Sequence, residues 1–183
     1  MTELEADIRA AVRKLCEHFG DGYWREMDEQ RAYPDAFVRA MTEAGYLAIL
    51  IPEVYGGSGL GIREASIVLE EINRSGGNAA VCHAQMYIMG TLLRHGSEEQ
   101  KRLYLPKIAA GELRLQAFGV TEPDAGSDTS SIRTTAVRTS DGYIVNGRRF
   151  GRHASSILIS SYSWYAQRRP TRSPNEQRDS LFS

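Results

Sequence analysis

Apolar residues recur every three or four positions through most of the chain up to Gly111, which is the spacing of one face of an α-helix. Charged residues fill many of the positions between them. The pattern predicts helices over residues 3–18, 35–44, 63–73 and 78–94. Ser97 and Gln100 form a capping-box motif, which predicts the start of a further helix that Pro106 should disturb. We therefore expect an all-α domain over residues 1–112.

The glycine-rich segment 56–61 follows an apolar run, residues 46–52, that is too short to form a helix before Pro52. By composition the segment resembles a dinucleotide-binding loop. Its glycines do not have the G-x-G-x-x-G spacing, however, and no strand–loop–helix unit surrounds them. We therefore predict a tight connection that lets helices pack closely.

After Leu113 the spacing of apolar residues changes from that of a helix to that of β-strands. Apolar and β-branched residues predict strands over 115–120, 132–138 and 143–147, with a hairpin turn at 140–142. The fold class is therefore α+β, in which the all-α domain is followed by the first strands of a β domain over residues 113–149.

The first predicted strand leads into a turn-rich loop, residues 121–128, that carries candidate binding chemistry. Thr121 and Ser127 supply hydroxyl donors, and Gly126 would let a ligand approach the backbone closely. Free backbone N–H groups together with such hydroxyls are suited to holding a phosphate. The alternative is an acidic surface loop in which three carboxylates are solvated and do nothing further. These carboxylates belong to Glu122, Asp124 and Asp128.

Composition and charge narrow the function classes. The 183 residues, 42% hydrophobic and 25% charged, suit one soluble domain, or one domain and part of another. A net charge of −1 argues against a nucleic-acid-binding protein. Cys16 and Cys82 are far apart and lack metal-ligand spacing, so we expect buried thiols in a reducing compartment. The acidic N-terminus has no secretory signal and no apolar run could span a membrane, so a cytoplasmic location is expected.

Several short motifs occur together in one order and spacing across residues 4–149. The most specific is Thr-Glu-Pro-x-Ala-Gly-Ser-Asp at 121–128. Taken together, the motifs resemble those of the acyl-CoA dehydrogenase family. The others are Gly45-Tyr46-Leu47, Ile51-Pro52-Glu53-Val54-Tyr55-Gly56-Gly57, Gly96-Ser97 with Gln100-Lys101, Tyr104-Leu105-Pro106-Lys107, Gly111-Glu112 and Asn146-Gly147.

The resemblance implies an N-terminal helical domain, a β-barrel-like middle domain and a C-terminal four-helix bundle, which this chain would lack. In the family, FAD lies between the middle domain and the bundle, and the loop after the first middle-domain strand contacts it. Carried over, this assigns Phe118, Val120 and Thr121 to the flavin. It assigns Gly126 and Ser127 to the flavin phosphate, or to the CoA portion of the acyl thioester substrate. No catalytic residue and no metal are assigned, because the family's catalytic carboxylate lies in the bundle.

The implied activity is oxidation of an acyl-CoA to the 2,3-enoyl-CoA, an oxidoreductase reaction of fatty acid metabolism. A carboxylate removes the α-proton while the flavin takes the β-hydride. The implied partners are acyl-CoA, an electron-transfer acceptor protein and further copies of the chain in a homo-oligomer. Three alternatives stay open: a non-catalytic helical interaction module, one part of a split dehydrogenase, and a related flavin monooxygenase or nitroalkane-type oxidase.

After Gly147 the chain departs from the family, which continues with a Trp-Ile/Thr-Thr/Ser step where this chain has Phe150-Gly151-Arg152-His153. From Arg148 to Ser183 there are seven arginines against one Glu and one Asp, so this part carries +5 and residues 1–147 carry −6. A basic tail of this kind can also be interpreted as a nucleic-acid-binding arm.

Our hypothesis for the tail is instead a one-base loss near the codons of residues 148–150. Synonymous codons for residues 149–166, read one base earlier, permit the family's missing Trp-Thr-Ser step. Residues 150–183 would then be an aberrant, disordered tail, and the chain a catalytically incomplete fragment. The coding DNA tests this directly.

Overall fold

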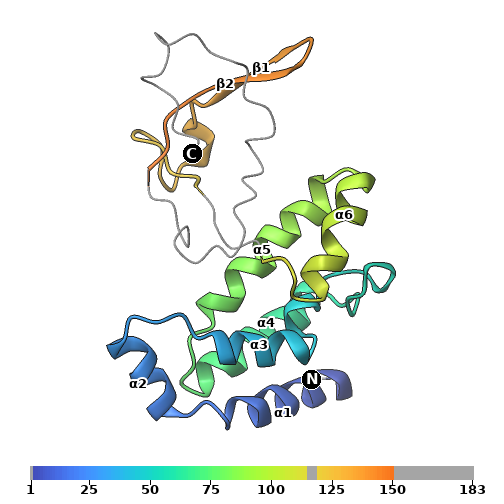
Figure 1. The fold of residues 1–183 in the computed structure, drawn as a ribbon, viewed down its shortest axis with the longest axis vertical. Coiled ribbons are helices and arrows are strands. Elements are labelled where there is room, and N and C mark those ends of the chain that lie inside the picture. Colours follow the sequence, from blue (N-terminus) through green and yellow to red (C-terminus); the bar gives the residue numbers. More distant parts are fainter. Residues whose placement is uncertain (1, 115–118, 151–183) are drawn as a thin grey trace. The chain divides into compact units, whose positions relative to one another are not determined.

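The computed structural model describes residues 2–114 and 119–150 (Figure 1). Internal contacts divide the chain into two compact units, Met1–Gln116 and Ala117–Ser183. The first is helical and the second contains a two-stranded antiparallel sheet. This confirms the predicted fold class of a helical domain followed by the start of a β domain. The expected disordered tail lies, except for Phe150, outside the described residues.

Four of the helices follow the periodicity closely. They are α1 (Glu3–Cys16), α3 (Asp35–Glu43), α4 (Ile62–Arg74) and α5 (Ala80–His95). The Ser97 side chain accepts a bond from Gln100 N at 3.2 Å, and Gln100 accepts one from Ser97 N at 2.8 Å, so the capping box is confirmed. Short 3₁₀ turns occupy Tyr46–Ala48 and Glu53–Tyr55.

Helix α2 (Asp21–Glu29) was not predicted from the sequence. Gly20 is in fact its N-cap residue, and the helix buries none of its residues fully. Its place is fixed by aromatic rings instead. The Trp24 ring lies 4.9 Å from that of Phe37, and the Tyr23 ring 5.0 Å from that of Phe19, both edge-on.

Helix α6 (Glu98–Ala109) contradicts the expectation that Pro106 interrupts it. Proline removes one backbone donor and is costly within a helix. Leu105 and Ile108, on either side of it, are both fully buried. Packing therefore outweighs the local preference, and the helix ends at Ala109, just before Gly111 at φ 76°.

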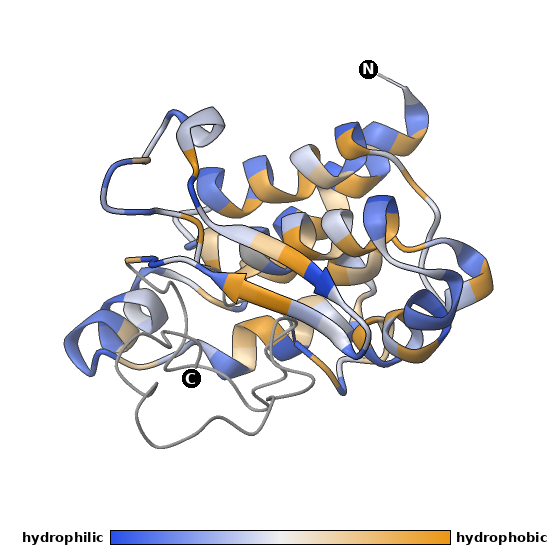
Figure 2. Cartoon of the chain, turned by 90° about the horizontal axis from the view of Figure 1, so that it is seen from above, coloured by the Kyte–Doolittle hydropathy of each residue, from blue (hydrophilic) through white to orange (hydrophobic). Residues whose placement is uncertain are grey.

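The helical unit buries two clusters of apolar side chains. The larger contains residues of α1, α3, α4 and α5, among them Val12, Phe37, Val68 and Cys82. The smaller includes Met89, Leu105 and Ile108 of α5 and α6. Figure 2 shows hydrophilic and hydrophobic residues alternating along the helices, as amphipathic packing requires.

A buried carboxylate joins α1 to α4. The Glu71 side chain is 0% exposed. It accepts bonds from Arg9 at 2.7 Å and Arg13 at 3.0 Å, while Arg9 also pairs with exposed Glu70 at 2.7 Å. The ion pairs satisfy a charge that would otherwise be costly to bury.

The glycine-rich segment is a tight connection, as predicted, although it packs on the preceding apolar run. A Cβ built on Gly57 would lie 2.2 Å from the carbonyl oxygen of Ile51. Gly59 N donates to that same oxygen at 2.8 Å, and Leu60 N donates to Ile49 O at 2.9 Å. The backbone comes too close at Gly57 for any side chain.

The second unit pairs β1 (Thr135–Thr139) with β2 (Gly142–Asn146), in a register that places Val137 opposite Ile144. The hairpin turn is confirmed, with Gly142 at φ 148°. The predicted second strand is three residues too long at its start, where the chain instead bonds to a side chain described below. The predicted strand 115–120 lies mostly outside the described residues. Nearly every strand position is exposed.

None of the helices in the described part of the chain is both long and apolar enough to cross a membrane.

Candidate functional site

The loop from Gly119 to Asp128 begins with a tight turn over Pro123 and Asp124. Glu122 N donates to Ala125 O at 2.9 Å, and Ala125 N donates back to Glu122 O at 3.3 Å. Ala125, the last residue of the turn, is buried. The turn gives residues 119–128 a defined backbone path.

The Glu122 side chain turns inward and is 6% exposed. Its carboxylate accepts bonds from the backbone N–H of Arg133 at 2.7 Å and of Thr134 at 3.0 Å, and also from the Thr134 hydroxyl. These bonds replace the strand pairing predicted for residues 132–134. The Arg149 guanidinium lies 3.7 Å from the same carboxylate.

The segment before Phe150 holds the other side of the loop. Arg149 Nη1 donates to Gly119 O at 3.0 Å, and Phe150 N donates to Thr121 O at 2.7 Å. The loop is therefore bonded to two stretches of chain, one about ten residues and the other nearly thirty residues further on.

Hydrogen bonding lowers the pKa of two of the loop's carboxyls. The Thr134 hydroxyl, followed by the backbone of Arg133, lowers the pKa of Glu122. The hydroxyls of Ser130 and Ser131 lower the pKa of Asp128, which caps the 3₁₀ turn Thr129–Ser131. The interpretation as a loop of merely solvated carboxylates is therefore wrong for Glu122 and Asp128. It holds better for Asp124, which is 68% exposed and pairs loosely with Arg133 at 3.4 Å.

Donors of the loop remain available on its outer side. Among the bonds between described residues, none uses the backbone N–H groups of Gly126, Ser127 or Asp128, or the hydroxyls of Thr121 and Ser127. Three successive N–H groups with an adjacent hydroxyl are suited to an anion.

The remaining predicted cofactor residues lie on the same loop, apart from Phe118, which is outside the described residues. Val120 is 38% exposed, and Thr121 is exposed. A Cβ built on Gly126 would meet no atom within 4 Å, so space is open beside it. Their role in binding a cofactor stays a prediction. Sequence reasoning missed Glu122 and Arg149 as the residues that shape the loop.

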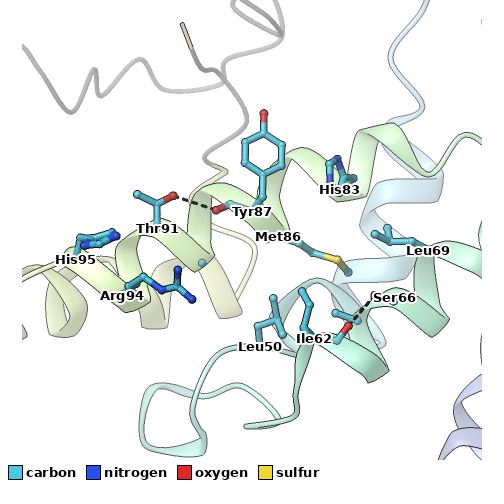
Figure 3. Close-up of a pocket in the computed structure, with 12 residues that line it drawn as sticks. Leu50, Ile62, Ser66, Leu69, His83, Met86, Tyr87, Thr91, Arg94 and His95 are labelled. Carbon is cyan, nitrogen blue, oxygen red and sulfur yellow. Dashed lines mark hydrogen bonds between the residues drawn. The ribbon is translucent and has the colours of Figure 1, made fainter. Parts of the chain in front are cut away.

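A separate groove lies between α4 and α5 in the helical unit, with a volume of about 430 Å³ (Figure 3). Apolar side chains of Leu50, Ile62, Leu69 and Met86 line it, and Gly90 leaves open space along α5. Its polar lining residues are Ser66, His83, Tyr87, Thr91, Arg94 and His95.

Two hydroxyls of this groove, those of Ser66 and Thr91, have internal partners. Thr91 Oγ1 donates to Tyr87 O at 3.2 Å and Ser66 Oγ to Ile62 O at 2.8 Å. His83 is exposed, and its ring lies 5.0 Å from that of Tyr87. No group of three or more His, Cys, Asp or Glu among the described residues could hold a metal ion.

Comparison with known proteins gives consistent results for both units. The family model described as "Acyl-CoA dehydrogenase, N-terminal domain" matches residues 2–112. Glutaryl-CoA dehydrogenase of Desulfococcus multivorans is 38% identical over 152 residues, which cover 80% of this chain and 38% of that protein. The chain thus spans about two-fifths of this relative's length.

Solved structures agree with these matches. An acyl-CoA dehydrogenase from Geobacillus kaustophilus superposes with a TM-score of 0.69 at 32% identity, covering 83% of this chain and 40% of that one. An acyl-CoA dehydrogenase from Bacillus anthracis, complexed with FAD, superposes with a TM-score of 0.72 at 28% identity, covering 85% of this chain and 28% of that one. The match of the family model over more than half of the residues shows that this chain belongs to the acyl-CoA dehydrogenase family.

Proposed function

We propose that this chain is the N-terminal part of an FAD-dependent acyl-CoA dehydrogenase, which oxidises an acyl-CoA to the 2,3-enoyl-CoA. The observation that carries the proposal is the outward side of the loop 119–128. There, the N–H groups of Gly126, Ser127 and Asp128 and the hydroxyls of Thr121 and Ser127 have no partner among the described residues, and Val120 is exposed. A relative complexed with FAD supports the choice of cofactor.

Two groups of loop residues suit two parts of FAD, the flavin ring and the pyrophosphate. Val120 and Thr121, with Phe118, would contact the flavin ring, for which a half-exposed apolar side chain and one hydroxyl are suited. Gly126 and Ser127 would hold the pyrophosphate, or the CoA portion of the substrate, because N–H groups and a hydroxyl can surround an anion there. The open space beside Gly126 leaves room for close approach.

FAD, when bound, would supply the acceptor for the hydride of the substrate. The described residues supply binding and orientation. Glu122 and Asp128 already accept several hydrogen bonds each and lie low in pKa, so neither is suited to remove the substrate's α-proton. We therefore assign no catalytic base within residues 119–128. The complete reaction would need a carboxylate from the part of the family's length that this chain does not span.

The α4–α5 groove is our candidate for the acyl chain. Its apolar lining and its volume of about 430 Å³ suit an aliphatic or aromatic group. Its lining includes no acidic residue, so an acyl group with a polar or anionic end could also be accommodated.

A second proposal is that the chain acts as one part of a split enzyme, or as a helical interaction module, since the helical unit buries two apolar clusters of its own. Co-purification with a separately encoded polypeptide carrying the remainder, and restoration of activity on mixing, would favour the split enzyme. An electron-transfer acceptor protein and homo-oligomer formation remain proposals for the completed protein.

The test is an FAD titration of the purified chain, followed by visible absorbance and flavin fluorescence. We expect binding, and we expect Gly126→Ala to weaken it by about tenfold or more, which corresponds to about 1.4 kcal/mol. The added methyl group meets nothing in the protein itself, so lost affinity reports a clash with the ligand.

Gly22→Ala in α2 is the matched control, because its Cβ also meets no neighbour. An unsubstituted chain that leaves the FAD spectrum unchanged would contradict the proposal. So would equal affinities of the Gly126→Ala variant and the unsubstituted chain.

A further inference from the structure

Glu122 lies between residues that face outward, yet its own side chain is buried. Val120 is 38% exposed, Thr121 is exposed, and Glu122 is 6% exposed. The inward Glu122 side chain thus lies directly beside exposed Thr121, which carries one of the loop's hydroxyl donors.

The bonds to Glu122 come from parts of the chain that are distant in sequence. Its two carboxylate oxygens accept from Arg133 N at 2.7 Å and Thr134 N at 3.0 Å, besides the Thr134 hydroxyl. Arg149 adds a guanidinium at 3.7 Å. Hydrogen bonds to an ionised acceptor are about twice as strong as those between neutral groups. One carboxylate thus ties the loop to residues 133–134 and to residue 149.

Gly147 packs closely against Thr134, one of the residues that bind the Glu122 carboxylate. A Cβ built on Gly147 would lie 2.2 Å from the Thr134 hydroxyl oxygen. Thr134 is therefore held between the Gly147 backbone and the Glu122 carboxylate. Only glycine allows this approach, which keeps the hydroxyl directed at the carboxylate.

We propose that Glu122 is a positioning residue, an ionised carboxylate that fixes the conformation of the loop 119–128 and so presents Thr121, Gly126 and Ser127 to a ligand. That the ligand is FAD rests on the proposed function. The role of Glu122 in the loop does not. If the loop adopts the ligand-binding conformation only part of the time, its apparent affinity for the ligand falls in proportion to the fraction of molecules in that conformation.

The test uses the whole chain and nuclear magnetic resonance of backbone amides. In the unsubstituted chain, the amide protons of Arg133 and Thr134 should titrate together, with a midpoint below the ordinary value for glutamate. Arg149 is the charged side chain that faces the carboxylate, while the Arg133 guanidinium lies with Asp124 instead. A purely packed side chain would give no such shared titration.

Glu122→Gln replaces one acceptor oxygen by an NH₂ group that faces donors, so it should abolish the titration and speed hydrogen exchange across the loop. Asp124→Asn is the matched control. It removes one negative charge from the same turn, but from an exposed side chain, and should leave both readouts unchanged. FAD affinity should fall by about tenfold in Glu122→Gln and stay within about twofold in Asp124→Asn.

The outcomes separate the two proposals. No shared titration at Arg133 and Thr134, or equal loop exchange in both variants, would overturn the role of Glu122. Faster exchange in Glu122→Gln with unchanged FAD affinity would also overturn it, because the loop conformation would then not matter for binding. If the unsubstituted chain binds no FAD, the proposed function fails, and the titration and exchange results still decide whether Glu122 fixes the loop. Thr134→Val, which removes only the hydroxyl, should loosen the loop less and serves if Glu122→Gln does not fold.

Discussion

Glu70 and Glu71 are adjacent carboxylates that both bind Arg9, yet their removal should have very different consequences. The Glu71 side chain is 0% exposed and binds Arg9 at 2.7 Å and Arg13 at 3.0 Å. The Glu70 side chain is 57% exposed and binds Arg9 alone at 2.7 Å. Exposed ion pairs contribute about 0–1 kcal/mol, so Glu70→Gln should barely change the free energy of unfolding.

Removing the Glu71 carboxylate and removing its two arginine partners should lower the free energy of unfolding by different amounts. Glu71→Gln leaves the two arginines, 23% and 51% exposed, able to bind water, and should cost about 1–3 kcal/mol. Replacing both arginines by methionine leaves a buried carboxylate without its bonded cations, with only the charge of Arg74 still acting on it. That double substitution should cost about 3–5 kcal/mol.

The assay is urea unfolding followed by far-ultraviolet circular dichroism, at neutral pH and again in acid. Burial raises the pKa of Glu71, but bonds from Arg9 and Arg13 outweigh it, so the pKa is lowered overall. A lowered carboxyl pKa contributes stability that is complete above the unfolded value, near 4.5, and is lost as pH falls through the folded value. Glu71→Gln should therefore lose part of the acid dependence of the unfolding free energy. An equal cost for Glu70→Gln and Glu71→Gln, or a larger cost for Glu71→Gln than for the double arginine variant, would refute this reasoning.

Two further predictions concern the helical unit. Gly57→Ala should destabilise it by about 1–3 kcal/mol, because the methyl group would lie 2.2 Å from Ile51 O, whereas Gly90→Ala meets no neighbour and should stabilise α5 by about 0.5–1 kcal/mol. Thermal unfolding of the two variants measures both effects, and a shift of the same sign in both would contradict the interpretation. Burial raises the pKa of Cys82 to about 12 and also raises that of Cys16, so neither thiol should react with iodoacetamide at pH 8 until the chain unfolds. Mass spectrometry of labelled native protein checks this, and rapid native labelling at Cys82 would show that its surroundings open.

The sequence predicted the helices that bury a repeating apolar face and missed one that buries no residue fully. Helices α1, α3 and α4 each bury a repeating apolar face, which the spacing of apolar residues reveals. Helix α2 buries no residue fully, although Tyr23, Trp24 and Met27 have helical spacing, and rings of Trp24 and Phe37 from separate segments hold it. The expected break at Pro106 failed for a related reason, since the burial of its neighbours depends on residues far along the chain.

The candidate loop was predictable in position but not in shape. Thr121, Gly126 and Ser127 stand out as donors and turn residues from local sequence alone. An acidic residue in a loop is ordinarily solvated, so nothing local indicates that Glu122 turns inward. That follows from Arg133, Thr134 and Arg149, which bind it from further along the chain.

Glu71 and Glu122 show why a buried carboxylate has different consequences in the two units. Glu71 lies in a unit that buries large apolar clusters, so losing its ion pairs should reduce stability and leave the fold in place. In the second unit nearly every strand position is exposed, and a two-stranded hairpin is marginal by itself. Polar bonds to Glu122 therefore provide much of the order of the loop. Glu122→Gln should consequently speed hydrogen exchange in residues 119–135 while leaving the exchange of α1 and α4 unchanged. Faster exchange in those helices as well would mean that Glu122 supports the whole chain and has no specific role in the loop.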